Sequence, residues 1–143
     1  MLRTVKLPAT INILGEINAI IEQTLPASLS SCVLKTQLVV EELLANICSY
    51  AYNGAEGCAE FACGIVNFDG KKCIMIQLTD EGMPYDPFAQ SKAPDLEASV
   101  EDRAVGGLGV FLVKEIATHY LYMRIDNRNQ AQIILSLDDE SLA

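Results

Sequence analysis

Residues 39–52 read VVEELLANICSYAY, and the fold depends on this stretch more than on any other. Its apolar side chains recur at helical spacing and predict one buried stripe: Val40, Leu43, Leu44, Ile47. Glu42 and Asn46 lie four residues apart and share a different face of that helix, about 40° apart around its axis. Glu41 lies about 140° from Asn46 and cannot join that pair.

A carboxylate beside a neutral amide on one helix face suits a magnesium–phosphate site. The amide oxygen of Asn46 can ligate the hard cation, and the carboxylate of Glu42 can orient or deprotonate a nucleophile. The same pair would also fit an ordinary solvated helix face. This stretch alone leaves both interpretations open.

Outward from this helix, the spacing of apolar residues alternates between helical and strand-like periods, which predicts an α/β chain. In chain order we expect a strand at 4–7, helices at 10–21 and 30–52, strands at 60–68 and 72–79, a helix at 109–118 and strands at 120–126 and 131–137. Asp69-Gly70 predicts a hairpin turn, and residues 127–130, NRNQ, predict a second. The resulting fold is a two-layer sandwich with three helices on one face of a mixed, mainly antiparallel sheet, formed by one domain over residues 1–143.

The composition excludes several classes of function. The formal net charge is −9 with only 10 Lys and Arg residues, so nucleic acids and anionic membranes are not expected partners. No apolar run reaches the roughly 18 residues of a membrane span, and the first residues do not form a signal peptide, which predicts a cytoplasmic protein. Five cysteines without a C-x-x-C pair and the single His119 argue against a zinc site.

A second candidate stretch is LTDEGMPYDP at residues 78–87. Asp80 ends a predicted strand, and its carboxylate can accept a hydrogen bond from an exocyclic amine such as that of adenine. Gly82 is expected to let a flat ring approach the main chain. An ordinary Asp-x-Gly turn would have the same sequence.

The third stretch, VGGLGVFLVK at residues 105–114, places three glycines at the start of a predicted helix. A helix N-terminus offers unpaired amides and about half a positive charge, and glycines allow a phosphate chain to approach them. No Gly-Lys-Ser/Thr follows, so this is not a Walker loop, and the dinucleotide fingerprint is absent too. The alternative is a flexible hinge before a core helix. The proline-bearing loop at 87–105 that precedes it is expected to be a lid.

Together, in this order, the three stretches resemble the boxes of the Bergerat-fold (GHKL) ATPases. Within that superfamily the chain looks like the anti-sigma-factor serine/threonine kinases of bacterial partner-switching systems. EELLANICSYAY resembles their N box, DEGMPYDP their Asp-x-Gly box and VGGLGVFLVK their second glycine box, while YMRIDNRN at 122–129 resembles the ending that follows. The resemblance covers roughly residues 5–137.

This resemblance implies an ATP- and Mg²⁺-binding kinase. It places Glu42 at the catalytic glutamate, Asn46 at the magnesium ligand and Asp80 at the adenine-binding aspartate. The remaining implied nucleotide contacts are Tyr50, Gly82, Gly106, Gly107, Leu108, Gly109 and Val110. The implied partners are an anti-sigma-antagonist protein that receives the phosphate, a sigma factor that is sequestered when the antagonist is absent, and a second copy of the chain in a homodimer.

Two departures from the family pattern keep an alternative open. Tyr50 stands where these kinases usually carry histidine, and the loop at 87–105 holds more carboxylates than basic residues. A module that uses ATP only to set its shape, and sequesters a regulatory protein without catalysis, would share the same boxes. A histidine-kinase fragment is disfavoured, because the only histidine lies near the C-terminus.

Overall fold

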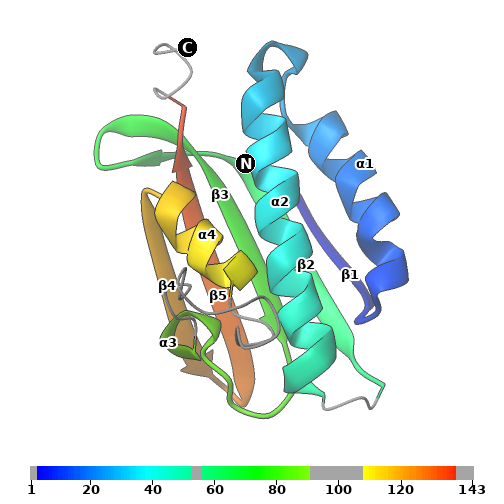
Figure 1. The fold of residues 1–143 in the computed structure, drawn as a ribbon. Helices are drawn as coiled ribbons and strands as arrows, with labels where there is room; N and C mark the ends of the chain where they lie inside the picture. The colour runs from blue at the N-terminus through cyan, green and yellow to red at the C-terminus, as the bar shows by residue number, and fades with distance from the viewer. Residues whose placement is uncertain (1–2, 53–55, 91–107, 138–143) are drawn as a thin grey trace, which may run out of the picture.

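Five strands form one sheet, and the main helices pack on one of its faces (Figure 1). The computed structural model describes residues 3–52, 56–90 and 108–137. The strands are β1 (Arg3–Pro8), β2 (Cys58–Phe68), β3 (Lys71–Asp80), β4 (His119–Ile125) and β5 (Arg128–Ser136). The helices are α1 (Leu14–Thr24), α2 (Ser30–Asn46), α3 (Pro87–Gln90) and α4 (Leu108–Ile116). Short 3₁₀ turns at Ile11–Ile13 and Ala27–Leu29 lead into α1 and α2, and a π-helical turn at Ile47–Ala51 extends α2.

The strand order is β1-β2-β3-β5-β4, and every pairing among the described strands is antiparallel. The α/β fold with three helices on one sheet face is thus confirmed (Figure 1). Asp80 at the end of β3 pairs with Asn129 near the start of β5. This pairing brings together two residues that are far apart in the sequence, at one end of the sheet.

The core lies between the sheet and the helices. It is dominated by branched aliphatic side chains from both layers, which suits a close-packed interior. The members that are entirely inaccessible to solvent include Ile17, Ile21, Val39, Val40, Leu44, Phe61, Ile74, Ile76, Val113 and Ile133. Packing of α2 and α4 on this core fixes which of their polar faces meet at the site described below.

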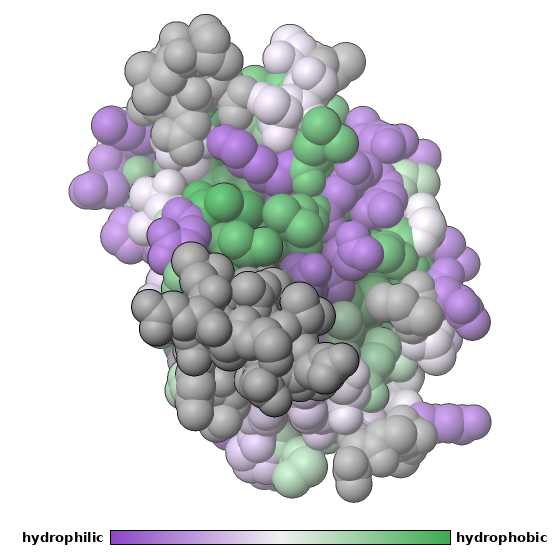
Figure 2. Space-filling model, viewed as in Figure 1, coloured by the Kyte–Doolittle hydropathy of each residue, from purple (hydrophilic) through white to green (hydrophobic). Residues whose placement is uncertain are grey.

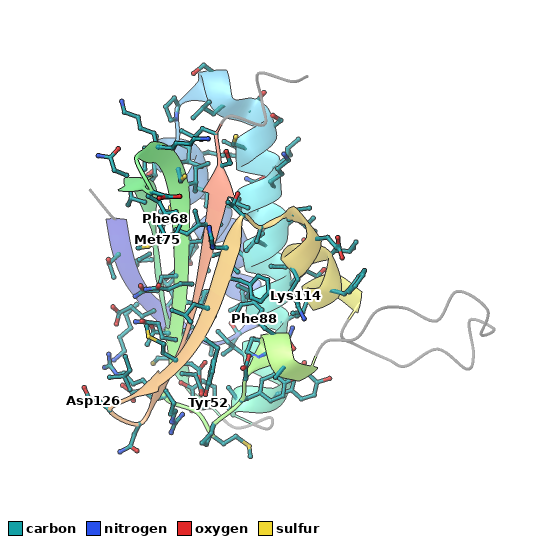
Figure 3. All side chains as sticks on the ribbon, turned by 90° about the vertical axis from the view of Figure 1, so that its left-hand side faces the viewer. Tyr52, Phe68, Met75, Phe88, Lys114 and Asp126 are labelled. Atoms are coloured by element: carbon teal, nitrogen blue, oxygen red, sulfur yellow. The ribbon has the colours of Figure 1, made fainter. Side chains whose placement is uncertain are left out.

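The two hairpin turns differ in how well the sequence predicts them. Asp69 and Gly70 both have positive φ, as the Asp-Gly signal predicts for a two-residue turn. The second turn is formed by Asp126 and Asn127, also with positive φ, at the tip of the β4–β5 hairpin (Figure 3). The expected turn at 127–130 is therefore wrong by about two residues, because β5 already begins at Arg128.

Apolar side chains also reach the surface on the helix side. Figure 2 shows a hydrophobic area over α4 and the neighbouring part of α2. Leu34 and Leu38 of α2 and Leu112 of α4 are 68%, 37% and 44% exposed. In the described part of the chain, no helix has the length and apolar character needed to cross a bilayer.

Candidate functional site

The polar face of α2 carries Glu42 and Asn46, both partly buried. The opposite side of the helix is fixed in the core by Val40 and Leu44, so this polar face cannot turn freely. The Nδ2 atom of Asn46 donates a hydrogen bond of 2.9 Å to the backbone oxygen of Glu42. Because the helix backbone uses the amide nitrogen, the amide oxygen is the atom left for a ligand such as a hard cation.

Asp80 is 5% exposed and lies at the end of β3. Its Oδ1 atom accepts hydrogen bonds from the backbone N–H of Gly82 and from Nδ2 of Asn129, each 2.9 Å long. Among the described residues, no donor is bonded to the second carboxylate oxygen, Oδ2. The carboxylate is therefore held firmly by one oxygen while the other can accept a hydrogen bond from a ligand.

Asn129 holds this end of the site together, and it is 4% exposed. Besides the bond to Asp80, its Nδ2 donates to the backbone oxygen of Met83 at 2.8 Å. Its Oδ1 accepts from the hydroxyl of Tyr122 at 2.5 Å and from the backbone N–H of Tyr85 at 3.2 Å. All four hydrogen-bonding positions of this amide are used, so it fixes the loop after β3 relative to the sheet.

Gly82 packs closely against another segment of the protein. A Cβ atom at this position would collide with the backbone and side chain of Ala51 at the end of the π-helical turn. The backbone N–H of Met83 donates to the oxygen of Ala51 at 2.8 Å, and Arg124 donates to the oxygen of Gly82 at 2.7 Å. The missing side chain therefore allows close packing of protein on protein, and the Cβ side of Gly82 is already filled.

Tyr52 adds a further support next to Asp80 (Figure 3). Its hydroxyl donates to the backbone oxygen of Cys58 at 2.6 Å and accepts from the N–H of Glu81 at 2.8 Å. Burial is the main factor that raises the pKa of this phenol. The ring also fills the space in which a side chain at position 57 would lie. One side chain thus connects the segment after α2 with the beginning of β2 and the end of β3.

Tyr50 and Tyr85 form a stacked pair. Their ring centroids are 4.9 Å apart with 14° between the planes, and Tyr50 is 42% exposed. Burial is also the main cause that raises the pKa of Tyr85, with a further contribution from Tyr50. Tyr50, which replaces the histidine expected from the resemblance, thus lies against a residue of the Asp-x-Gly box.

A pocket opens between these elements. Its lining combines apolar side chains with a few polar groups that converge from separate segments, as is typical of ligand pockets. The lining residues are Leu43, Asn46, Ile47, Ala51, Leu78, Asp80, Tyr85, Pro87, Tyr122, Asn129 and Ala131. The enclosed space is about 20 Å³, close to what one water molecule needs. Entry of a purine ring therefore requires side chains such as that of Tyr85 to move.

The N-terminal turn of α4 meets α2 at Glu42. A Cβ atom at Gly109 would collide with the carboxylate of Glu42, so the two lie in direct contact. Burial raises the pKa of this carboxyl above its ordinary value of 4.5, and the adjacent Glu41 raises it further. The helix pair thus brings a carboxylate with a raised pKa to a helix N-terminus, one turn of α2 from Asn46.

The other residues of the second glycine box divide into three groups. Gly106 and Gly107 lie outside the described residues, as do residues 91–105 of the expected lid. Leu108 begins α4, so its backbone N–H belongs to the first turn, where amides lack intrahelical partners. The side chain of Val110 is 2% exposed and packs in the core, so only its backbone N–H can face a ligand.

The first four residues of the expected lid form α3 and are anchored on the protein. The Nζ atom of Lys114 in α4 donates to the backbone oxygen of Phe88 at 3.1 Å (Figure 3). The same ammonium group lies over the ring of Tyr120, 5.6 Å from its centre, and Phe88 contacts that ring as well. Lys114 therefore fixes the start of the lid segment to both α4 and β4.

Sequence reasoning missed Asn129, Tyr122 and Tyr85 as site residues. Tyr122 and Asn129 belong to the YMRIDNRN ending, but nothing in that ending shows that its amide reaches Asp80, 49 residues earlier. The strand pairing of β3 with β5 makes this contact. The aromatic position of the Asp-x-Gly box was the available signal for Tyr85.

A protein-family model described as a histidine kinase-like ATPase domain matches residues 7–136. The match spans nearly the whole chain and includes every segment of the site described above. The chain is a member of the histidine kinase-like ATPase domain family. Among curated proteins, none matches the chain. Membership in the histidine kinase-like ATPase family, part of the GHKL superfamily, supports ATP binding by this chain.

The arrangement of side chains fits the nucleotide that this family membership implies. Asp80 offers Oδ2 as an acceptor for an exocyclic amine, and the first turn of α4 offers backbone amides suited to phosphates. No cluster of three or more His, Cys, Asp or Glu side chains that could hold a metal occurs in the described ranges. If a Mg²⁺ ion binds with the nucleotide, the amide oxygen of Asn46 would be able to hold it, and the ion would offset charge on the phosphates.

Proposed function

We propose that this domain is an ATP- and Mg²⁺-dependent regulatory protein kinase of the cytoplasm. It transfers phosphate to a serine or threonine of an anti-sigma-antagonist protein, and it sequesters a sigma factor when that antagonist is absent. The observation that supports phosphotransfer most directly is the contact between Glu42 and Gly109. This contact puts a carboxylate at the helix end where the phosphates of ATP are expected.

The proposed chemistry assigns one task to each group. Asp80 accepts a hydrogen bond from the adenine amine, and Asn46 holds Mg²⁺, which neutralises charge on the phosphates. Glu42 accepts the proton of the attacking hydroxyl. The hydroxyl oxygen bonds to the γ-phosphorus while the bond from that phosphorus to the bridging oxygen of ADP breaks, and ADP leaves.

The raised pKa of Glu42 is consistent with this role. A base whose pKa lies closer to the working pH accepts a proton more readily than an ordinary carboxylate does.

Single-turnover phosphate transfer tests the proposal. Wild type and Glu42→Gln are mixed with labelled ATP, Mg²⁺ and the antagonist encoded in the same gene cluster. We expect Glu42→Gln to bind ATP nearly as well as wild type, since it keeps the size of the side chain, and to transfer phosphate about 10²–10⁴-fold more slowly.

Two results would contradict the kinase. Equal measurable rates for the two proteins would exclude Glu42 as the base. No transfer by wild type, with ATP-dependent binding of the sigma factor retained, would favour the alternative of a non-catalytic module that sequesters its partner.

A further inference from the structure

Gly109 lies in the first turn of α4, and the space that its side chain would occupy is taken by one group. A Cβ atom at this position would collide with Oε2, Cδ and Cγ of Glu42. These three atoms are the nearest ones, and all belong to the end of a flexible side chain. At Gly82, by contrast, the nearest atoms belong to Ala51, two of them to its backbone.

We propose that Gly109 is a positioning residue for Glu42: the missing side chain, and not the freedom of the backbone, gives the carboxylate its place on α4. The φ angle of Gly109 does not lie in the left-handed region, so an L-amino acid could adopt the same backbone. This inference rests on the proposed function, because it concerns the placement of the group that accepts the hydroxyl proton.

The position matters because proton transfer depends steeply on geometry. A displacement of about 1 Å in a reacting group can lower a rate by about 10²-fold. A methyl group at position 109 must push the carboxylate of Glu42 away from the helix end, because the helix backbone that carries the methyl group cannot move as easily as a side chain. The backbone N–H of residue 109 remains available to phosphate in such a variant.

The test is steady-state transfer by Gly109→Ala. Alanine is the better helix former, so α4 is expected to persist and the variant to fold. We expect kcat to fall by at least about tenfold while KM for ATP changes by less than about threefold, because the base moves and the amides stay. A wild-type kcat would overturn the inference. A large rise in KM with kcat unchanged would overturn it too, because it would assign the glycine to nucleotide contact.

Gly15→Ala is the matched control. Gly15 lies in helix α1, and a Cβ atom there meets nothing within 4 Å. The same chemical change is thus made in a helix without touching Glu42. We expect wild-type kcat and KM for Gly15→Ala, and a loss of kcat equal to that of Gly109→Ala would show that the effect is not local.

Two further measurements make the inference specific. In the Glu42→Gln background, Gly109→Ala should lower transfer by less than about twofold, because the base whose position it sets is already absent. A full additional loss in the double variant would overturn the positioning role.

The second measurement needs no activity, so it separates failure of the inference from failure of the proposed function. Crystal structures of nucleotide-free wild type and Gly109→Ala report the position of the Glu42 carboxylate directly. We expect the carboxylate to lie farther from the first turn of α4 in the variant, because the added methyl group takes the space that Oε2, Cδ and Cγ of Glu42 occupy. An unmoved carboxylate in Gly109→Ala would overturn the inference even if wild type proves to be no kinase.

Discussion

The two ends of the site are held in opposite ways. At the sheet end, Asp80 and Asn129 are 5% and 4% exposed and bonded to one another. The amide of Asn129 uses every donor and acceptor that it has. At the helix end, no hydrogen bond from a described residue to the carboxylate of Glu42 is seen, and this carboxylate lies against Gly109.

This difference matches what each end is proposed to do. Recognition of a nucleobase needs hydrogen-bond acceptors that are already in place, and a fully bonded buried network provides that rigidity. A proton acceptor works better when its charge is not already neutralised by fixed donors. The proposed site thus combines a rigid region for binding with a less constrained group for chemistry.

The largest effect on the rigid end of the site is expected from replacing Asn129. Asn129→Ala removes one of the two hydrogen bonds to the buried carboxylate of Asp80 and the acceptor of the part-buried hydroxyl of Tyr122. We expect the free energy of unfolding to fall by roughly 3 kcal/mol, because each unsatisfied buried group costs about 1–3 kcal/mol. Urea denaturation followed by circular dichroism measures this change.

Gln132→Ala is the control for that experiment. Gln132 lies on the same strand and donates a hydrogen bond of 2.9 Å to Gln77. Because this pair is only part-buried, its loss should cost about 1 kcal/mol or less. Equal destabilisation by the two variants would show that the network around Asn129 contributes no more to the free energy of unfolding than an ordinary part-buried hydrogen bond.

A smaller effect is expected from Asp80→Asn, which acts on binding more than on folding. The asparagine keeps an oxygen for the N–H of Gly82 but loses the charge that faces the ligand. ATP binding should weaken by about 1.5–3 kcal/mol, the usual contribution of a hydrogen bond to a charged group. Isothermal titration calorimetry with ATP and GTP measures it.

Two comparisons make the calorimetric measurement specific to Asp80. Wild type should prefer ATP to GTP, because guanine presents a carbonyl where adenine has an amine. Asp86→Asn serves as control. Among the described residues, Asp86 accepts hydrogen bonds from the N–H groups of Phe88 and Ala89, which a neutral amide oxygen can also accept. Equal affinity of wild type for both nucleotides would rule out Asp80 as the adenine acceptor.

The smallest expected effect concerns stability at the helix end. In the folded protein, burial and Glu41 place the pKa of Glu42 above its value in the unfolded chain. The folded state therefore binds this proton more tightly, and wild type loses stability as the pH rises from the unfolded pKa through the folded one. Glu42→Gln has no proton to lose.

The stability of Glu42→Gln relative to wild type should therefore rise across that pH window and stay constant above it. The change is expected to be small, because the carboxylate remains partly exposed to water. Denaturation midpoints of both proteins, measured between about pH 4 and pH 8, test the sign. A difference that does not vary with pH would mean that the pKa of Glu42 is not raised by folding.

The sequence predicted the elements of the fold well, because periodicity is local information. The Asp69-Gly70 turn was placed correctly, since glycine at a position of positive φ is a direct signal. The turn at Asp126 and Asn127 carries no glycine, and its prediction was displaced into β5. A turn that places aspartate and asparagine, rather than glycine, at positive φ is harder to predict from a sequence, because both residues also occur in many other conformations.

For the site, the sequence identified which segments meet but not how they are supported. Glu42 and Asn46 share a helix face, so their proximity follows from helical geometry alone. Asn129 reaches Asp80 only through the pairing of β3 with β5, which one-dimensional patterns do not contain. The function of Gly82 was predicted for a ligand, whereas the contact with Ala51 depends on how the end of α2 packs on the loop.

The π-helical turn at Ile47–Ala51 amounts to one extra residue inserted into the winding of α2. It directly follows Asn46 and contains Tyr50 and Ala51, so it sets the angle at which Tyr50 meets Tyr85 and at which Ala51 meets Met83. In a regular α-helix of the same residues, Tyr50 would lie only about 40° around the axis from Asn46. The wider turn changes that angle, so the shape of the helix end, as well as the residue spacing, sets how α2 meets the loop that follows Asp80.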